Sequence, residues 1–376
     1  MQFPLTSEQR SIQRAVNEFT RGEYDNDQIF ALLKEGRFPE RIWKKACQLG
    51  FIGLLFPEEC GGQECSLMEQ ILVTEAMCRK DSSVGIALTF ADMGAEIICA
   101  LGSALQKKRL FAITKGKHIS AAIFFDLDKN SAASASGMML TKDAGTYRLN
   151  GRSRHVFNAD LADFYIVQCR FEGGQGFVLV EKGAIGVSVA AMGSKLGLGM
   201  LAWYEVAFDD VEVACEQLLL TDSADYLKSF PQHRLLRIAA IYVGVAQGAY
   251  DQAIAYSKQR VQFKRKLAEF QGIRHKLADM YRQLTASRSL LYHAGSLLSE
   301  ATNLDIADLT MVKLQAEETC RYVCYEALQI FGGTGYMVEM PIEHFYRDAV
   351  MLQAMSGRSI FQKDRLAEHI IGRLAD

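Results

Sequence analysis

The spacing of apolar residues changes twice along this chain. From residue 5 to about residue 117, apolar side chains recur every three or four positions, which is typical of amphipathic helices. Ser7 and Glu8 supply a helix N-cap candidate and an early acidic residue, and Gly50 follows an apolar stretch as a C-cap candidate. Further helices are predicted over residues 66–79, 83–101 and 105–114.

Between residues 119 and 215 the helical period disappears. Short segments rich in β-branched and aromatic residues follow one another at 120–125, 146–149, 164–167, 176–180 and 204–208. Turn candidates such as Asn150-Gly151 and Asp209-Asp210 separate them. About six strands without intervening helices predict an antiparallel barrel or sandwich.

A second helical block begins near Pro231 and continues to the end of the chain. Its long periodic segments are 234–258, 272–300 and 306–331, followed by a last one from about residue 360, and together they predict a four-helix bundle. We therefore expect an α+β fold with an N-terminal helical domain over 1–117, a middle β domain over 118–225 and a C-terminal helical bundle over 226–376.

Composition narrows the classes of function. With 42 Lys+Arg against 44 Asp+Glu, the chain lacks the basic surplus of a nucleic-acid binder. Its apolar runs look shorter than the ~20 residues that span a bilayer, and residues 1–21 are too polar for a signal peptide. We expect a cytoplasmic protein without a membrane span.

The nine cysteines show no spacing typical of a zinc site, so no metal is expected. Cys320 and Cys324 are one helical turn apart and are interpreted as two buried helix positions, with a redox pair as the alternative. In a reducing cytoplasm we expect all nine to be free thiols.

Five motifs follow one another in a fixed order. They are residues 49–62 (LGFIGLLFPEECGG), residues 101–110, the Arg260–Phe263 run with Gln271 eleven residues after Arg260, the run from Gln329 to Tyr336, and the run from Pro341 to Asp348. Each motif is weak alone, but in this order they resemble the acyl-CoA dehydrogenases, and the α–β–α layout agrees with that resemblance.

The resemblance implies FAD as cofactor and an acyl-CoA or acyl-carrier-protein thioester as substrate. It also implies a homodimer or homotetramer. The reaction of the family is α,β-dehydrogenation: a carboxylate base takes the α-proton, and the β-hydrogen leaves as hydride to the flavin. Hydrogen-bond donors must hold the thioester carbonyl, and the base needs a water-poor pocket that raises its pKa.

Several residues match the family's cofactor-binding positions. Arg260 matches the arginine that reaches the FAD diphosphate of a neighbouring subunit, a task suited to a permanent multidentate cation. Phe263 and Gln271 are in register with it. Gln329, Gly332 and Gly333 match the loop that meets the adenosine end of FAD, where glycine allows close backbone approach. Lys264 stands where the family usually has glycine.

The β domain departs from the family pattern. The family's Thr-Glu-Pro segment is absent, and the matching residues 124–128 read Phe-Phe-Asp-Leu-Asp. The Trp-x-Thr-Asn element that packs the flavin ring reads His155-Val-Phe157-Asn158, so only the Asn is kept. By position, His155 and Phe157 are candidates to contact the flavin; alternatively, His155 is a partly exposed polar residue beside a turn.

Neither family position for the catalytic base carries a carboxylate. Ser356 occupies the usual Glu position, followed by Gly357, and Arg234 occupies the alternative position at the start of the first bundle helix. No acidic residue lies between Tyr226 and Tyr250, so a small alignment shift does not supply one. His233 and Glu343 are weaker candidates, as a helix-start residue and part of a shared structural motif.

Three interpretations remain open. The chain is a flavin dehydrogenase with another base, or a partner-dependent subunit of a hetero-oligomer whose Glu-bearing homologue supplies the base. In the third interpretation it is a non-redox acyl-thioester-binding protein. In that case Arg234 and Arg358, which replace a carboxylate, favour an anionic group in the pocket.

Overall fold

The computed structural model describes residues 3–124, 137–143, 145–172, 174–219, 224–300, 304–357 and 359–375. Its first part is helical: α1 (Ser7–Glu23), α2 (Asn26–Glu35), α3 (Glu40–Gln48), the short η1 (Glu58–Cys60), α4 (Leu67–Lys80), α5 (Ser82–Phe90), α6 (Ala95–Leu101) and α7 (Ala104–Thr114). Capping boxes at Thr6, Ser66 and Ser103 begin α1, α4 and α7. Helix α4 is buried on nearly all sides at the centre of the molecule.

The single helix predicted over 83–101 is wrong, because α5 and α6 are separate. The chain turns at Gly94, whose φ of +91° is in the left-handed region. Within the turn, the buried Asp92 accepts a hydrogen bond from the Gly53 backbone N–H (2.9 Å). The window Ser82–Leu101 is nevertheless long and apolar enough, by length and composition alone, to cross a membrane. The expectation that every apolar run is too short to span a bilayer was therefore wrong. However, 72% of this window is buried inside the chain, as in a core helix.

The middle part forms one eight-stranded sheet in the order β6-β7-β3-β2-β4-β5-β8, with β1 also paired to β4. The strands are β1 (Ser120–Ile123), β2 (Met139–Asp143), β3 (Thr146–Phe157), β4 (Phe164–Phe171), β5 (Gly174–Glu181), β6 (Val187–Ala191), β7 (Trp203–Val213) and β8 (Leu218–Leu219). The predicted antiparallel arrangement is correct for most pairs, but β1 and β2 each pair with β4 in parallel, so the sheet is mixed.

Two predicted turns are irregularities inside long strands instead. Asn150-Gly151 lies within β3, and Asp209-Asp210 lies opposite it within β7, where the register shifts. Asp210 takes a φ of +53°, and its backbone N–H donates to the Asn150 side chain (2.8 Å). Residues that often form turns here form a β-bulge, which bends the strand pair without ending it.

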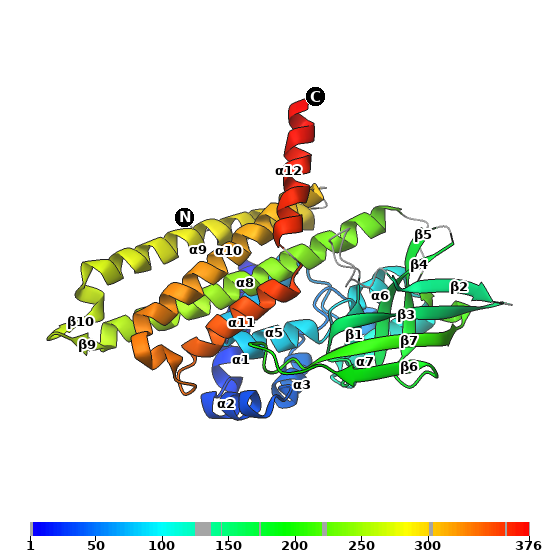
Figure 1. Ribbon diagram of the computed structural model, residues 1–376, viewed down its shortest axis with the longest axis horizontal. Coiled ribbons are helices and arrows are strands. Elements are labelled where there is room, and N and C mark those ends of the chain that lie inside the picture. The colour runs from blue at the N-terminus through cyan, green and yellow to red at the C-terminus, as the bar shows by residue number, and fades with distance from the viewer. Residues whose placement is uncertain are drawn as a thin grey trace.

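The last part is a helical bundle. It consists of α8 (Ala224–Gln259), α9 (Gln271–Ser299), α10 (Ile306–Phe331), α11 (Ile342–Met355) and α12 (Ser359–Ala375), with Pro231 inside α8. A small hairpin of β9 (Val261–Gln262) and β10 (Arg265–Lys266), then η4 (Leu267–Glu269), joins α8 to α9, and η5 (Gly332–Tyr336) follows α10. The sheet lies at one end of α8 and the hairpin at the other (Figure 1).

Helix α11, which the apolar pattern alone did not predict, attaches the bundle to the other two parts. The buried Asp348 accepts hydrogen bonds from the hydroxyls of Ser82 (2.7 Å) and Ser83 (2.5 Å) and from the Leu198 backbone N–H (2.6 Å). One helical turn earlier, His344 contacts Asp81 through Nε2 (2.9 Å). The motif from Pro341 to Asp348 therefore fixes how α11 meets α5 and the loop after β6.

Candidate functional site

The predicted cofactor residues Arg260 and Phe263 lie on the β9–β10 hairpin. All residues of the hairpin are exposed, and Phe263 is 88% exposed. Phe263 and Lys264 form its two-residue turn with φ of +49° and +63°. Positive φ at both positions is the geometry of a type I′ turn, in which glycine relieves strain at the second position. Lys264 therefore takes a conformation better suited to the glycine that the family usually has there.

Gln329, Gly332 and Gly333 lie at the same end of the bundle as this hairpin (Figure 1) and are also exposed. A stacked pair of aromatic rings holds the ends of α8 and α10 together. The ring centroids of Tyr256, near the end of α8, and Phe331, at the end of α10, are 4.1 Å apart. Gln271 begins α9 after the short η4 that follows the hairpin, and it is exposed too. The structure brings these predicted residues together at one end of the molecule.

His155 and Phe157 lie at the other end of α8, on strand β3 of the sheet. The exposed His155 ring stacks on the Trp203 indole of the neighbouring strand β7 (centroids 4.8 Å apart, planes at 29°). The Phe157 ring meets Phe90 of α5 edge-on at 5.2 Å. Within one chain, the two groups of predicted cofactor residues are thus at opposite ends of α8 (Figure 1).

The backbone around His155 is unusual. His155 and Asn158 take φ of +65° and +56°, and the β3–β7 register shifts between Ser153 and Val156. Non-glycine residues in this region are strained, and such strain often marks a functional site. Asn158 is 1% exposed, and neither atom of its side-chain amide has a hydrogen-bond partner in the described part of the chain. A buried amide without a partner is costly unless a ligand satisfies it.

Ser356, at the predicted base position, is buried and directly follows α11. Its hydroxyl lies 2.7 Å from the phenol oxygen of Tyr242 on α8, within hydrogen-bond distance. Burial first, and then the nearby Glu317 carboxylate, raise the pKa of Tyr242 well above its ordinary value. At neutral pH both groups are therefore protonated hydroxyls, and neither is a ready proton acceptor.

A buried ion pair lies behind Ser356. Lys313 and Glu317, one turn apart on α10, bond to each other with almost no exposed surface. Lys313 also donates to the Gln362 side chain (3.0 Å), whose amide group donates in turn to the Ser356 backbone carbonyl (3.3 Å). Glu317 accepts further bonds from Gln353 and Ser359. The carboxylate nearest to Ser356 in this network is thus already occupied.

Two of the other residues considered for the base position, Arg234 and Glu343, have structural partners. The guanidinium of Arg234 lies over the Phe124 ring at 5.5 Å, and Glu343 pairs bidentately with Arg347. His233 lies inside α8, after Pro231, and burial lowers its pKa. Arg358 and residues 125–128 are outside the described residues.

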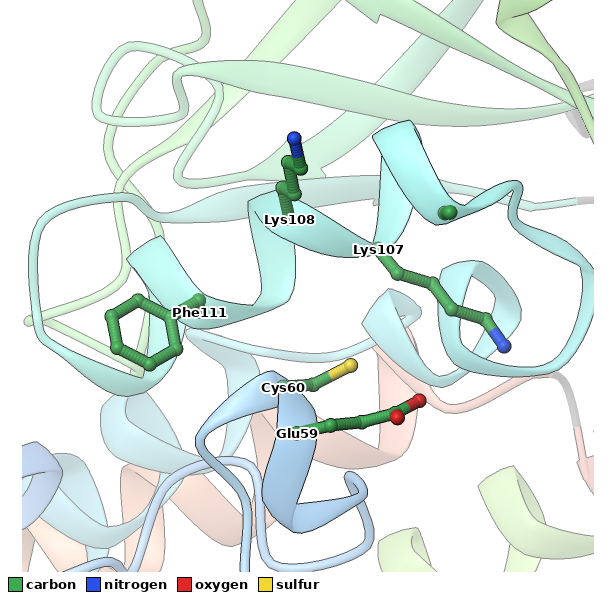
Figure 2. A pocket seen from close by; sticks show the side chains of 6 residues that line it. Glu59, Cys60, Lys107, Lys108 and Phe111 are labelled. Atoms are coloured by element: carbon green, nitrogen blue, oxygen red, sulfur yellow. The ribbon is translucent and has the colours of Figure 1, made fainter.

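Two pockets lie away from these residues. One, of about 530 Å³, is lined by η1 and α7 residues including Glu59, Cys60 and Lys107 (Figure 2). Burial and then the Glu59 charge raise the pKa of the Cys60 thiol, so it is a poor nucleophile. The other, of about 760 Å³, lies between α3 and the sheet and includes Trp43, Ala202 and Tyr204. The first pocket is lined mainly by residues of the motifs at 49–62 and 101–110, but neither pocket contains a residue predicted to bind the cofactor or to act as the base.

Three site features were not predicted from the sequence: Tyr242 against Ser356, Trp203 against His155, and a buried ion pair of Arg237 with Asp92. Each pair joins residues that are distant in the chain. The sequence contains only a weak sign of these contacts. Tyr242 and Arg237 are polar residues in a long apolar helix, and Trp203, one of only two tryptophans, begins a strand. The nine cysteines, including the buried Cys320 and Cys324, are free thiols as expected.

Comparison with known proteins identifies the family of this chain. Family models for the acyl-CoA dehydrogenase N-terminal, middle and C-terminal domains match residues 6–116, 127–211 and 225–371. An acyl-CoA dehydrogenase of Bacillus subtilis is 31% identical over 98% of this chain and 99% of its own length. The caffeyl-CoA reductase–Etf complex subunit CarC of Acetobacterium woodii is 30% identical over 96% and 97%.

The solved structure of butyryl-CoA dehydrogenase from Megasphaera elsdenii superposes with a TM-score of 0.89, at 28% identity over 99% of this chain and 100% of that one. The predicted fold class is thereby confirmed, with N-terminal helices, a middle sheet and a C-terminal helical domain. The chain belongs to the acyl-CoA dehydrogenase family, whose members are FAD-dependent oxidoreductases that act on CH–CH groups.

Proposed function

We propose that this protein is a cytoplasmic, FAD-dependent acyl-thioester oxidoreductase that works as a homodimer or homotetramer. The observation that carries the proposal is the separation of the predicted cofactor residues. Arg260 and Gln329 are exposed at one end of the bundle, whereas His155 and Phe157 belong to strand β3 of the sheet, which lies at the other end of α8 (Figure 1). One FAD molecule meets both groups when a second copy of the chain brings its Arg260 end to the first copy's sheet.

The residues present suit FAD. The exposed Arg260 guanidinium offers several donors for a diphosphate, and the loop at Gly332 and Gly333 carries no side chains that block a nucleotide. At the sheet, a planar polar ring suits the aromatic rings of β3 and β7 and the Asn158 amide, for which the described part of the chain supplies no hydrogen-bond partner. FAD, when bound, supplies the hydride acceptor for the β-hydrogen. We retain 1–117, 118–225 and 226–376 as the proposed domain limits.

Proton transfer at the α-carbon is where this chain departs from its family. Ser356 and Tyr242 hold a proton between two hydroxyl oxygens 2.7 Å apart, and the raised pKa of Tyr242 keeps that proton in place. Such a pair is poorly suited to remove an α-proton. Similarity to a protein named as a caffeyl-CoA reductase subunit supports work in the reductive direction.

A second candidate function follows from the same buried serine. A chain without a carboxylate at position 356 would serve as the partner-dependent subunit of a hetero-oligomer, in which a Glu-bearing homologue supplies the base. Its exposed Arg260 and Gln329 elements would then complete the FAD site of that homologue. Co-expression tests this candidate: flavin or activity gained only with the homologue supports it, and activity of this chain alone contradicts it.

The visible absorbance spectrum of the purified chain tests the first proposal. We expect flavin bands after incubation with FAD. In the oxidative direction they bleach when a mixture of acyl-CoAs is added anaerobically, and in the reductive direction the bands of the dithionite-reduced protein return when enoyl-CoAs are added. A chain that stays colourless with FAD is not an oxidoreductase by itself.

A further inference from the structure

We infer that Trp203 of strand β7 is the residue that packs against the isoalloxazine ring of FAD in this protein, in place of the tryptophan that the family carries at position 155. The inference rests on the proposed function, since it requires FAD to bind at the sheet. It assigns the ring contact to a different strand and to a residue outside the motifs.

Strand pairing places Trp203 on the correct face of the sheet. Phe157 and Trp203 are direct partners across the β3–β7 ladder, and side chains of paired residues lie on the same face. Since the Phe157 ring contacts Phe90 of α5, this face looks toward the helices. Ala202 and Tyr204, which alternate with Trp203, instead line the pocket against α3.

The Trp203 indole is held in a fixed plane. Its Nε1 donates a hydrogen bond to the Gly193 carbonyl (2.9 Å), and the His155 imidazole stacks against it at 4.8 Å. The ring is half-buried, so it keeps accessible surface after both contacts. A rigid, half-buried indole is a suitable surface for a planar aromatic ligand, because little side-chain freedom is lost on binding.

The adjacent backbone supplies independent support for a ligand at this place. The Asn158 backbone N–H donates to the Ala202 carbonyl (3.2 Å), so Asn158 is tied to the residue next to Trp203. Asn158 has a left-handed φ of +56°, and its buried amide has no hydrogen-bond partner among the residues that the structure describes. A flavin ring carries both donors and acceptors on its polar edge, which is the complement that an unpartnered amide requires.

Flavin emission tests the assignment directly. An indole in contact with a flavin quenches its fluorescence by electron transfer, which requires close approach. In Trp203→Leu we expect bound FAD to emit severalfold more light than in the wild type. Loss of one aromatic contact should also weaken FAD binding about 2- to 10-fold. Trp203→Tyr should restore most of the affinity and quenching, because tyrosine keeps an aromatic face and also quenches flavins.

The chain offers a matched control, because it has only two tryptophans. Trp43 is buried in the N-terminal helices, with Phe38 at 6.0 Å. Trp43→Phe should leave the emission and affinity of bound FAD unchanged. Far-ultraviolet circular dichroism verifies that each variant is folded, and Trp203→Phe replaces Trp203→Leu if the latter is not.

The outcomes separate this inference from the proposed function. Wild-type protein that takes up FAD, together with a folded Trp203 variant of unchanged emission and affinity, overturns the assignment of Trp203 alone. Wild-type protein that takes up no FAD overturns both. Equal effects of the Trp43 and Trp203 variants also overturn the assignment, since a general loss of stability would then explain them.

Discussion

The exposed end of the bundle and its buried centre differ in what constrains their residues. At the exposed end, solvent surrounds Arg260, Phe263 and Gln329, which we predicted from the family motifs. At the centre, Ser356, at the predicted base position, is hydrogen-bonded to Tyr242. A surface residue needs no particular neighbour within its own chain, so a motif kept there points to a ligand or a second copy. A buried polar residue must be satisfied by its neighbours.

Two residues that differ from the family motifs have a partner within this chain. Buried Ser356 lies within hydrogen-bond distance of Tyr242, and exposed His155 stacks on Trp203. Because residues in contact rarely act independently, reversing Ser356 alone is not expected to restore the family's chemistry.

The largest effect is expected from breaking the ion pair at the centre. Lys313→Met leaves the buried Glu317 without its cation, and we expect the free energy of unfolding to fall by about 3–5 kcal/mol. Urea denaturation followed by circular dichroism measures it. Lys363→Met is the matched control, because the Lys363–Glu318 pair is exposed and its loss should be undetectable. If both variants lost the same free energy of unfolding, the buried ion pair would contribute no more than the exposed one, and the contrast between them would be wrong.

Because Tyr242 and Ser356 are in contact, the effect of substituting one on proton exchange should depend strongly on whether the other is also substituted. Ser356→Glu alone places a carboxylate against the Tyr242 ring, so we expect little gain. Tyr242→Ala with Ser356→Glu provides room for that carboxylate, and the α-proton exchange of an acyl-CoA in D₂O should rise about 100-fold over the wild type.

Nuclear magnetic resonance follows this exchange without redox turnover. Tyr242→Ala alone is the control and should show no gain. If Ser356→Glu alone equals the double variant, Tyr242 does not block the position, and the two residues are not coupled.

At the exposed end, Arg260→Ala should weaken FAD binding about 10-fold or more, because a charge-assisted contact to the diphosphate is lost. Flavin absorbance retained after ultrafiltration measures the affinity. Arg265→Ala on the same hairpin is the control, since Arg265 pairs with Glu269 and lies over the Phe270 ring. An Arg260 variant that retains FAD as well as the control does would remove Arg260 from the proposed site.

The attachment of α11 should depend on pH. Burial alone lowers the pKa of His344, but the Asp81 carboxylate outweighs burial and raises it above its ordinary value. The pair therefore contributes its full stability below a pH of about 6.5 and loses it as pH rises through the folded-state pKa. The difference in urea midpoint between wild type and His344→Gln should shrink from about pH 6 to 9. A constant difference would mean that His344 is not charged in the folded protein.

The smallest effect is expected at the hairpin turn. Lys264→Gly removes the strain of a positive φ and should stabilise the protein by about 1 kcal/mol or less. Thermal unfolding measures it. Lys266→Gly is the control, because Lys266 has an ordinary φ of −68° and should lose stability on substitution. A gain in both variants would show that the turn is not the source of the strain.

Local signals accounted for much of the fold. The apolar period predicted a helix over residues 66–79, and α4 begins there with a capping box of Ser66 and Glu69, which satisfies backbone N–H groups that any helix start leaves unpaired. Asn150-Gly151 was misread as a turn, because the same residues also suit a bulge, and only the partner strand decides between them. The break between α5 and α6 depends on Gly53 and Arg237, which contact Asp92 from distant parts of the chain.

The candidate site was predictable only where motifs are continuous in sequence. Local runs of residues were enough to predict Arg260 and Gln329, and to show that position 356 carries no carboxylate. Tyr242 faces Ser356 from 114 positions away, and Trp203 meets His155 across two strands. Such partners are set by packing, and apolar periodicity carries no information about which buried polar groups meet.

The final helix is fastened to the molecule at one end. Three side chains in its first turns make hydrogen bonds: Ser359 to Glu317, Gln362 to the Ser356 carbonyl, and Lys363 to Glu318. The rest of α12 stands away from the bundle (Figure 1), and Ile370 and Ile371 are exposed. Through Gln362, the first turns of α12 contact the backbone carbonyl of Ser356, so the surroundings of the predicted base position depend on how this last helix is attached.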